Sequence, residues 1–270
     1  MRIDIGLRPF ERSYRILNLL FAMNEIQQLY QALTLVAVVL FFNFLERRRP
    51  GYPVDRKRDL PLNILAILVV IVAGEMWKML ILNGLNVLKV SKVLSFAGLH
   101  LLPGAVKIIL GLILADFCLY WVHWAMHRPR LWPTHAFHHS IAEVWWLSGA
   151  RTSVTHLFLF AVPQILLAYY IFRLTPVEAG VAFSIGVMVN VWIHINVKVN
   201  LGPLERIFIT PDYHRIHHGA KGLSRKNLGF VFTIWDRLFG TYVNPHSRGK
   251  DYELFSVSTR KGLLRMVLGF

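Results

Sequence analysis

Histidine is the residue type in this sequence whose spacing points most clearly to chemistry. Ten of the twelve histidines lie between His123 and His218. At the overall histidine frequency, a His-x-x-His-His pattern is expected about 0.02 times in a chain of this length, yet it occurs twice, so chance does not explain it. The three clusters are His123-Trp-Ala-Met-His127, His135-Ala-Phe-His138-His139 and His214-Arg-Ile-His217-His218.

The spacing within these clusters suits metal coordination. Side chains three or four residues apart share one face of a helix, so the members of a cluster point the same way. Imidazole is a ligand for iron, zinc, copper and nickel, and a tetrahedral zinc ion takes only four ligands. Nine convergent imidazoles therefore predict two ions with four or five imidazoles each. The predicted ligands are His123, His127, His135, His138, His139, His194, His214, His217 and His218.

The remaining histidines are weaker candidates. His156 begins an apolar run, where a metal ligand and a hydrogen-bonded residue at a helix start are equal alternatives. His100 falls at the opposite end of the apolar runs and His246 lies far along the tail, so both are excluded as ligands. A purely structural role for the clusters is disfavoured, because each buried nitrogen without a partner costs a few kcal/mol.

The elements that must position these histidines are apolar helices. Hydrophobic residues make up 55% of the 270 residues and charged residues 17%, whereas soluble domains carry about 25% charged residues. Intrinsic disorder is excluded by the apolar content. Runs near the roughly 20 residues needed to cross a bilayer occur at 30–45, 60–82, 103–122, 154–172 and 177–195. The predicted fold is all-α, an integral membrane helical bundle with a cytosolic helical cap rich in histidine.

Basic residues orient this bundle. The net charge is +15, which in an apolar chain indicates basic loops on the cytoplasmic side of a membrane, not nucleic-acid binding. The loop 46–59 is the clearest example, and it contains Arg47, Arg48, Arg49, Arg56, Lys57 and Arg58. If this loop is cytoplasmic, alternate crossings bring all three clusters and His194 to the cytoplasmic face. Four arginines before residue 16 do not fit this scheme, so the topology of the N-terminal segment is left open.

Three regions follow from these runs. Residues 1–29 form an N-terminal segment, with an interfacial helix as one interpretation, and residues 30–122 carry transmembrane helices. Residues 123–270 form a di-metal region with a transmembrane hairpin at about 154–195 and a cytosolic C-terminal cap. Within the run 60–82, Glu75 and Lys78 are expected to pair inside the bundle, because ionisable groups are costly in lipid. Thr210 followed by Pro211 predicts a capped helix start before the third cluster.

The histidine pattern resembles that of the fatty acid hydroxylase or sterol desaturase superfamily of membrane di-iron enzymes. Shared features are H-x3-H, H-x2-H-H, a histidine after a transmembrane hairpin, and a second H-x2-H-H. The likeness covers about 114–242, and departures include Trp124 and Leu228, where the family often has Arg and Tyr. Further matching segments are Asp116-x3-Tyr120, His194-Ile-Asn196, Thr210-Pro-Asp-Tyr-His214, Asn227-Leu-Gly229 and Trp235-Asp-Arg-Leu-Phe-Gly-Thr241.

The resemblance implies a membrane oxidoreductase that oxidises an unactivated C–H bond of a fatty acyl chain, sterol or related lipid. It implies two iron ions (Fe2+) as cofactors, O2 as co-substrate and an external electron donor. The implied partners are a lipid substrate, membrane lipids and a separate electron-transfer protein. Asp116 would orient a ligand imidazole by accepting its hydrogen bond, although a buried structural aspartate is an equal alternative. Tyr120, Asn196 and Asn227 are supporting candidates of the same kind.

Several functions remain in competition at this point. Hydroxylation is favoured, while desaturation and ether-lipid cleavage are variants that the same fold would support. A membrane metal-binding or transport protein belongs to a different class, and it is disfavoured because the clusters gather at one face instead of crossing the bilayer. A bis-histidine haem protein needs histidine pairs on facing spans within the bilayer, and its Soret band would identify it.

Overall fold

The computed structural model describes residues 29, 32–88, 98–219, 222–246, 254, 256–259 and 262–270. Within these ranges the regular structure is helical, apart from two isolated bridges, Phe208 with Phe232 and Gly219 with Leu254. The predicted all-α class is thereby confirmed. The interpretation of the segment 1–29 as an interfacial helix concerns residues that lie, except for residue 29, outside the described part of the chain.

Among the described residues, four helices are long and apolar enough to cross a membrane. They correspond closely to the predicted runs 60–82, 103–122, 154–172 and 177–195. The first predicted run, 30–45, is helical over 32–48 but is not among the four. The four are α2 (Arg56–Val87), α4 (Gly104–Met126), α6 (Val154–Ile165) continued by the π-helical turn η4 (Leu166–Ile171), and α7 (Pro176–His194).

Local sequence signals set the beginnings of these helices. Thr175 caps α7 and exchanges hydrogen bonds with Glu178, while Pro176 occupies the first helical position. Ser153 caps α6 by accepting a hydrogen bond from a backbone amide of the first turn. Thr210 caps the helix of the third histidine cluster, as predicted. Such caps satisfy amide groups that have no partner inside the helix, so they fix where each helix begins.

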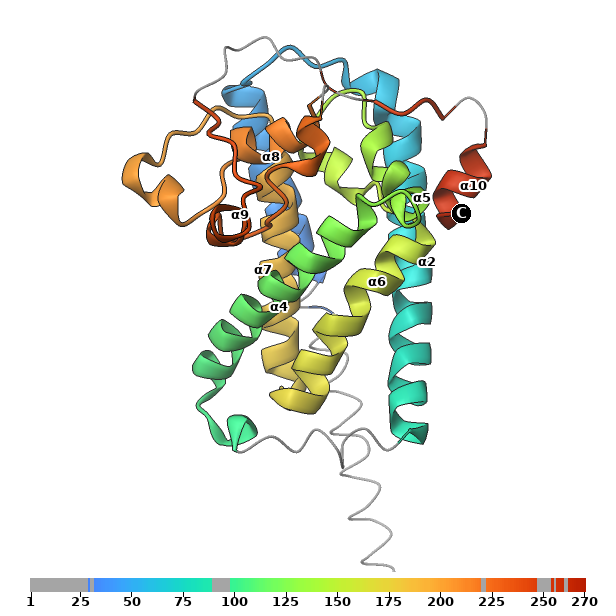
Figure 1. The fold of residues 1–270 in the computed structure, drawn as a ribbon, viewed down its shortest axis with the longest axis vertical. Coiled ribbons are helices and arrows are strands. Elements are labelled where there is room, and N and C mark those ends of the chain that lie inside the picture. The colour runs from blue at the N-terminus through green and yellow to red at the C-terminus, as the bar shows by residue number, and fades with distance from the viewer. Residues whose placement is uncertain are drawn as a thin grey trace, which may run out of the picture.

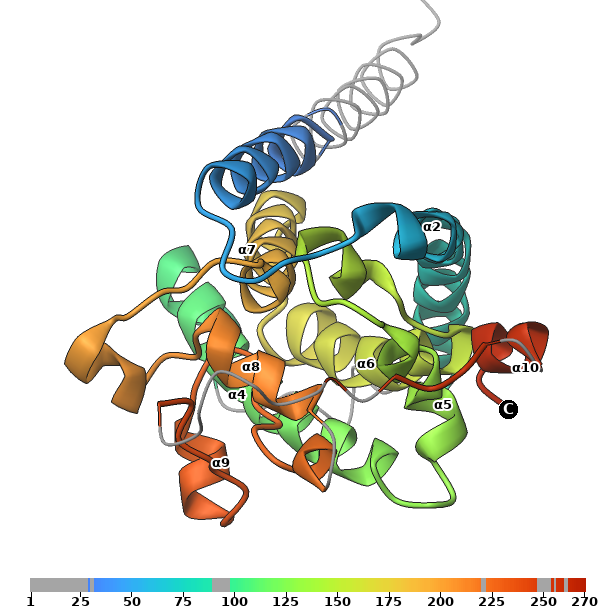
Figure 2. The ribbon, with the colours of Figure 1, turned by 90° about the horizontal axis from the view of Figure 1, so that it is seen from above.

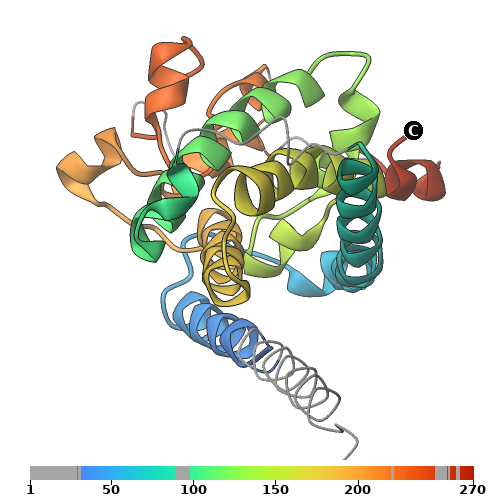
Figure 3. The same ribbon diagram turned by 90° about the horizontal axis from the view of Figure 1, so that it is seen from below.

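The bundle has a cap of short helices and loops at one end (Figure 1). The three histidine clusters lie on these short elements and at the adjoining end of α4. Helix α2 packs on α6, and α4 packs on both α6 and α7, as the view from the opposite end also shows (Figure 3). Figure 2, seen from the cap, shows α5, α8 and α10 around the upper ends of the long helices. The remaining short elements are η1 (Leu99–Leu101), α5 (Trp132–Ala136), η2 (His138–Ser140), η3 (Trp146–Ala150), η5 (Gly202–Arg206), α8 (Pro211–His217), η6 (Leu223–Arg225), α9 (Ile234–Leu238) and α10 (Leu263–Leu268).

The outward faces of the long helices are mostly apolar, as expected for helices that cross a bilayer. Large side chains such as Val72, Met79 and Phe183 are exposed there. Glu75 and Lys78 do form the expected ion pair, but they are 66% and 44% exposed, so the prediction that they lie inside the bundle is wrong. Ala73 of the same helix is buried, and at 100° per residue Glu75 lies about 200° around the helix from it.

The dry core lies where the cap meets the bundle. The largest fully buried apolar side chains there come from both parts of the chain, and the buried histidines lie among them. They include Tyr120, Met126, Phe137, Ile193, Ile209, Ile216 and Leu228. The histidines therefore lie among the fully buried side chains of the described chain.

Candidate metal centre

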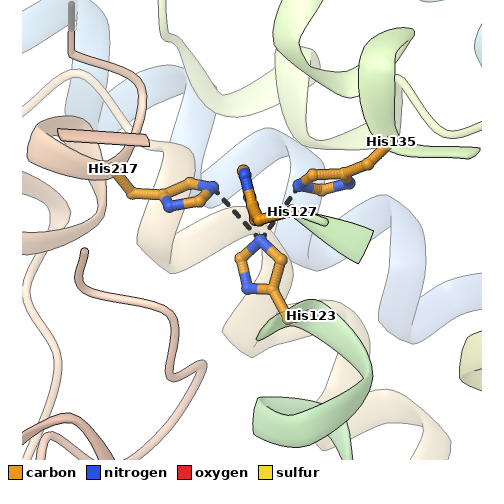
Figure 4. A group of neighbouring side chains, drawn as sticks. All are labelled: His123, His127, His135 and His217. Atoms are coloured by element: carbon orange, nitrogen blue, oxygen red, sulfur yellow. Dashed lines mark hydrogen bonds between the residues drawn. The ribbon is translucent and has the colours of Figure 1, made fainter. Parts of the chain in front are cut away.

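Eight of the nine predicted ligands form two compact groups, and within each group the ligand nitrogens lie within 4.8 Å of one another. All eight histidines are buried. Figure 4 shows the four rings of the first group turned toward a shared centre. The structure thus brings the separate clusters together, while their role as metal ligands stays a prediction. The first group is His123, His127, His135 and His217; the second is His138, His194, His214 and His218.

Helix ends deliver most of these side chains. His123 and His127 lie in the last turn and at the C-cap of α4, and His194 is the last residue of α7. The second cluster is not one continuous helical face, because α5 ends at Ala136 and a 3-10 turn follows. This break sends His135 to the first group and His138 to the second.

The rings of four ligand candidates are oriented by backbone carbonyls. In each case Nδ1 is the nitrogen that faces the carbonyl oxygen. Because a carbonyl can only accept a hydrogen bond, Nδ1 must carry the proton, and Nε2 keeps its lone pair. The Nδ1–oxygen pairs are His123 with Leu228 (2.7 Å), His217 with Lys226 (3.1 Å), His138 with Arg151 (3.1 Å) and His194 with Asn190 (2.8 Å).

The Nε2 atoms therefore point their lone pairs at one another. His123 Nε2 lies 3.1 Å from His217 Nε2, a contact drawn in Figure 4. Two lone pairs repel at this distance unless a proton or a metal ion lies between them. Two nitrogens that are each about 2.1 Å from one ion are about 3 to 3.4 Å apart. His123 Nε2 is also 2.9 Å from His135 Nε2, so the donor arrangement fits a cation.

Several buried ring nitrogens support the same conclusion. His127 Nε2 and both ring nitrogens of His218 are buried without a hydrogen-bond partner among the described residues. Burying an unsatisfied polar atom costs about 1–3 kcal/mol. Three such atoms in the two neighbouring groups therefore lower the stability of the metal-free protein. A metal ion on each group would satisfy the nitrogens that face the two centres.

Burial keeps these imidazoles neutral. For the histidines outside the membrane-spanning helices, desolvation of the charged form lowers the pKa well below the usual 6.5, and charge on neighbouring rings lowers the pKa further. The neutral form is the one that binds a metal ion, so at pH 7 the donors are ready for coordination. These histidines are His127, His135, His138, His139, His214, His217 and His218.

His139, the ninth predicted ligand, lies between the two groups. It is fully buried, and its Nε2 is 3.0 Å from His217 Nε2. Its ring centroid is 4.8 Å from that of His135 and 4.9 Å from that of His218. This position suits a fifth ligand for the first group, although that assignment stays a prediction.

Histidines outside the clusters occupy three different environments. His156 is buried behind the first group, and its Nδ1 is 3.3 Å from Nδ1 of His135. His100 lies in η1, at the end of the bundle away from the cap. His246 is exposed and interacts with Glu205. His100 and His246 belong to neither group, and their exclusion as ligands stays a prediction.

Asp116 contacts the backbone beside the ligand candidates, which differs from the expected hydrogen bond to an imidazole. Its buried carboxylate accepts hydrogen bonds from three successive backbone amides, those of Phe230, Val231 and Phe232, at 3.0–3.2 Å. It also accepts one from Trp235 Nε1 at 2.8 Å. The carboxylate therefore holds the loop that follows Leu228. Its partners are backbone amides instead of the expected imidazole, and such partners cannot be predicted from residue types because every residue except proline has the same amide.

Tyr120, Asn196 and Asn227 likewise hold the surrounding framework. The Tyr120 hydroxyl pairs with Thr241 at 2.8 Å. The Asn196 side chain exchanges hydrogen bonds with the backbone of Tyr52. Asn227 has a positive φ of 55°, and its side-chain amide donates to the carbonyls of Tyr213 and Val243 and accepts from the amide of Val243. Their partners differ from the expected ligand imidazoles, because the fold places loop segments beside them.

Two buried charged residues, Asp236 and Arg151, hold the backbone carbonyls that orient ligand candidates. This role was not predicted from the sequence. Asp236 accepts hydrogen bonds from the amides of Leu228 and Gly229, both at 2.8 Å, so it fixes the carbonyl that orients His123. Arg151 is fully buried, and its carbonyl oxygen orients His138. The Trp235–Thr241 motif contained Asp236, but only the fold shows what it holds.

The guanidinium of Arg151 ties three segments together. It donates hydrogen bonds to Asn63 Oδ1 and to the carbonyl of Ser140, both at 2.7 Å, and pairs with Asp59 at 3.2 Å. Burial lowers the pKa of Arg151 below its usual value, while Asp59 opposes that shift. The loop before α6 is therefore anchored to α2 through one charge network.

Comparison with known proteins assigns the part of the sequence that carries this site to a family. Residues 108–241, about half of the chain, match the family described as Fatty acid hydroxylase. No solved structure matches the chain significantly. The matched region contains every predicted ligand.

Three similar proteins illustrate the relationship. Ornithine lipid hydroxylase OlsE of Rhizobium tropici is 37% identical over 148 residues, which are 53% of this chain and 44% of that protein. Alkylglycerol monooxygenase of Homo sapiens is 36% identical over 47% of this chain and 28% of the relative. Lathosterol oxidase of Rattus norvegicus is 30% identical over 52% and 46%. The chain thus spans less than half the length of each relative. Through the region 108–241, it belongs to the fatty acid hydroxylase/sterol desaturase superfamily.

Proposed function

We propose that this protein is an O2-dependent lipid C–H oxidase that uses two iron ions, with hydroxylation as its reaction. The observation that carries the proposal is the pair of buried four-histidine groups at one end of an apolar bundle. The relatives support a lipid substrate, because they are named as an ornithine lipid hydroxylase, an alkylglycerol monooxygenase and a lathosterol oxidase. The substrate is a fatty acyl, sterol or related membrane lipid.

The reaction balances as C–H plus O2, two electrons and two protons giving C–OH plus water. When bound, iron would supply the activation of O2 and the oxidation of the C–H bond. The histidines would hold the ions as neutral donors, and the backbone carbonyls of Leu228 and Arg151 would keep two of their rings in one orientation. The surrounding core would exclude water from the oxidising centre.

The membrane setting and the electron supply are parts of the same proposal. The four apolar helices place the chain in a membrane, where a lipid chain can approach from the side. We propose that the metal centre faces the cytoplasm, because the loop at 46–59 is strongly basic. A separate electron-transfer protein would deliver the two electrons, and a basic face suits an acidic carrier.

Two variants of the reaction use the same site. Desaturation removes a second hydrogen and leaves an alkene. Hydroxylation beside an ether oxygen gives a hemiacetal, which collapses and cleaves the ether. The similarity to alkylglycerol monooxygenase supports this variant. A metal transporter is less compatible, because the histidines come from short cap elements and from the ends of α4 and α7 instead of lining a path through the bundle.

Metal analysis of gently purified protein, followed by lipid profiling of cells with and without the chain, tests the proposal. About two iron ions per chain and a lipid product with one added oxygen atom are expected, and the product should disappear without O2. A visible spectrum with a Soret band would identify a haem protein instead. The double variant His138→Ala/His217→Ala should bind little metal and form no product. Full activity in that variant would overturn the proposal.

A further inference from the structure

One ligand candidate of the first group, His135, has another side chain beside its Nδ1, where four of the other candidates have a backbone carbonyl. His123, His217, His138 and His194 each face a backbone carbonyl through Nδ1. His135 instead faces a second imidazole, with 3.3 Å between its Nδ1 and Nδ1 of His156. A carbonyl can only accept, whereas an imidazole nitrogen can accept or donate. The tautomer of His135 therefore depends on a side chain that substitution can change.

The fold gives His156 a fixed place behind the first group. It lies in the first turn of α6, where Ser153 Oγ accepts a hydrogen bond from its backbone amide at 3.1 Å. The ring is 3% exposed and packs against Phe160, with 4.3 Å between ring centroids. It belongs to neither histidine group. Its contact with His135 is on the side of that ring opposite to Nε2.

The Nε2 atom of His135 already points toward the first group. It is 2.9 Å from His123 Nε2, and the Nδ1 proton of His123 is fixed by Leu228. For His135 to present a lone pair there, its proton must lie on Nδ1. Nδ1 of His156 must then accept that proton in a hydrogen bond, which requires the His156 proton to lie on Nε2.

We infer that His156 is a positioning residue, not a metal ligand: it accepts the Nδ1–H hydrogen bond of His135 and so directs Nε2 of His135 to the first metal ion. The inference rests on the proposed function, since it concerns the affinity of one of the two proposed ions. Residues that orient a ligand in this way typically contribute 10–100-fold to metal affinity. Loss of the acceptor should weaken the first group and leave the second group intact.

Three substitutions separate an acceptor from a ligand or a space-filling ring. Asn carries its side-chain oxygen at nearly the position of histidine Nδ1, so His156→Asn keeps an acceptor for His135. Gln reaches the position of Nε2, so His156→Gln keeps polarity but moves the acceptor away. His156→Leu fills part of the space and has no acceptor. His246→Asn, in the exposed tail, is the matched control.

The experiment measures binding of Co2+, a spectroscopic probe for histidine sites, to the full chain in lipid nanodiscs. Ions per chain and affinity are obtained by competition with a chelator, and the cobalt d–d absorption reports the coordination of each site. His156→Leu and His156→Gln should lose about 10–100-fold in affinity at one of the two sites. His156→Asn should stay within a few-fold of the wild-type protein, and the control should match it.

The outcomes separate the role of His156 from the proposed di-metal function. Wild-type affinity at both sites in His156→Leu would overturn the role of His156 while the proposed di-metal function stands. An equal loss in the Asn, Gln and Leu variants would also overturn it, since a ligand or a packing role predicts no rescue. If the wild-type chain itself bound no Co2+, the proposed function would fail and this inference with it. Should the Leu variant not fold, the comparison of Asn with Gln still decides.

Discussion

The rings of the first histidine group are oriented by the loop that contains Lys226 and Leu228. Those of the second group are oriented by the loop before α6 and by α7. Two ligand candidates of the first group are oriented by the carbonyls of Leu228 and Lys226, and Asp236 accepts a hydrogen bond from the amide of Leu228 in the same loop. In the second group, Arg151 and Asn190 supply the corresponding carbonyls. The two centres share a core but have separate supports, so each should be alterable without the other.

Removal of one ligand candidate from each group should have the largest effect. We expect His217→Ala to lose the ion of the first group and His214→Ala to lose that of the second, and each variant should lose more than about 100-fold in activity. Iron analysis of the purified variants, each expected to retain about one ion per chain, checks this. Retention of both ions by either variant would contradict the grouping.

Arg151→Met should be the most destabilising change among the supports. It leaves the carboxylate of Asp59 buried without its cation, and breaking such a buried pair costs about 3–5 kcal/mol. Chemical denaturation of the purified protein in detergent measures the free energy of unfolding. Arg130→Met, at an exposed position of the same cap, should change it little, and equal losses in the two variants would argue against a special role for the buried charge.

Asp236→Asn should weaken the first group selectively. The new amide nitrogen faces a backbone N–H, so at least one charge-assisted hydrogen bond to Leu228 or Gly229 is lost, at about 1.5–3 kcal/mol. Metal titration should show weaker binding at one site only. Asp55→Asn is the matched control, because Asn also caps a helix well at that exposed position. Weakening of both sites would contradict the separation of the two supports.

The pH dependence of the metal-free protein should show a smaller effect. Burial lowers the pKa of His217 below the usual 6.5, so the unfolded chain takes up this proton first as the pH falls. The free energy of unfolding is thus highest above pH 6.5 and is lost as the pH falls toward the folded-state pKa. Each such imidazole contributes at most about 1.4 kcal/mol per pH unit. Denaturation of chelator-treated protein between pH 7 and 5 should show a shallower loss for His217→Ala, and an unchanged slope would contradict the prediction.

Much of the architecture was predictable because its causes are local. The runs 60–82, 103–122, 154–172 and 177–195 correspond to the four long apolar helices. Thr210 caps α8 because its side chain reaches an amide three residues away. The exposure of Glu75 and Lys78 was not predictable from their spacing. The spacing shows that the two residues share a face of α2, but it does not show whether that face points into the bundle or outward.

By itself, the sequence determined that nine histidines are candidate ligands and that apolar helices carry them, because residue types and short spacings contain that information. Only the tertiary structure decided how the histidines divide into two groups and what orients each ring. The acceptor of His123 is a carbonyl 105 residues away, and every residue type carries the same carbonyl. The placement of His156 behind His135 likewise depends on how α6 packs against the cap.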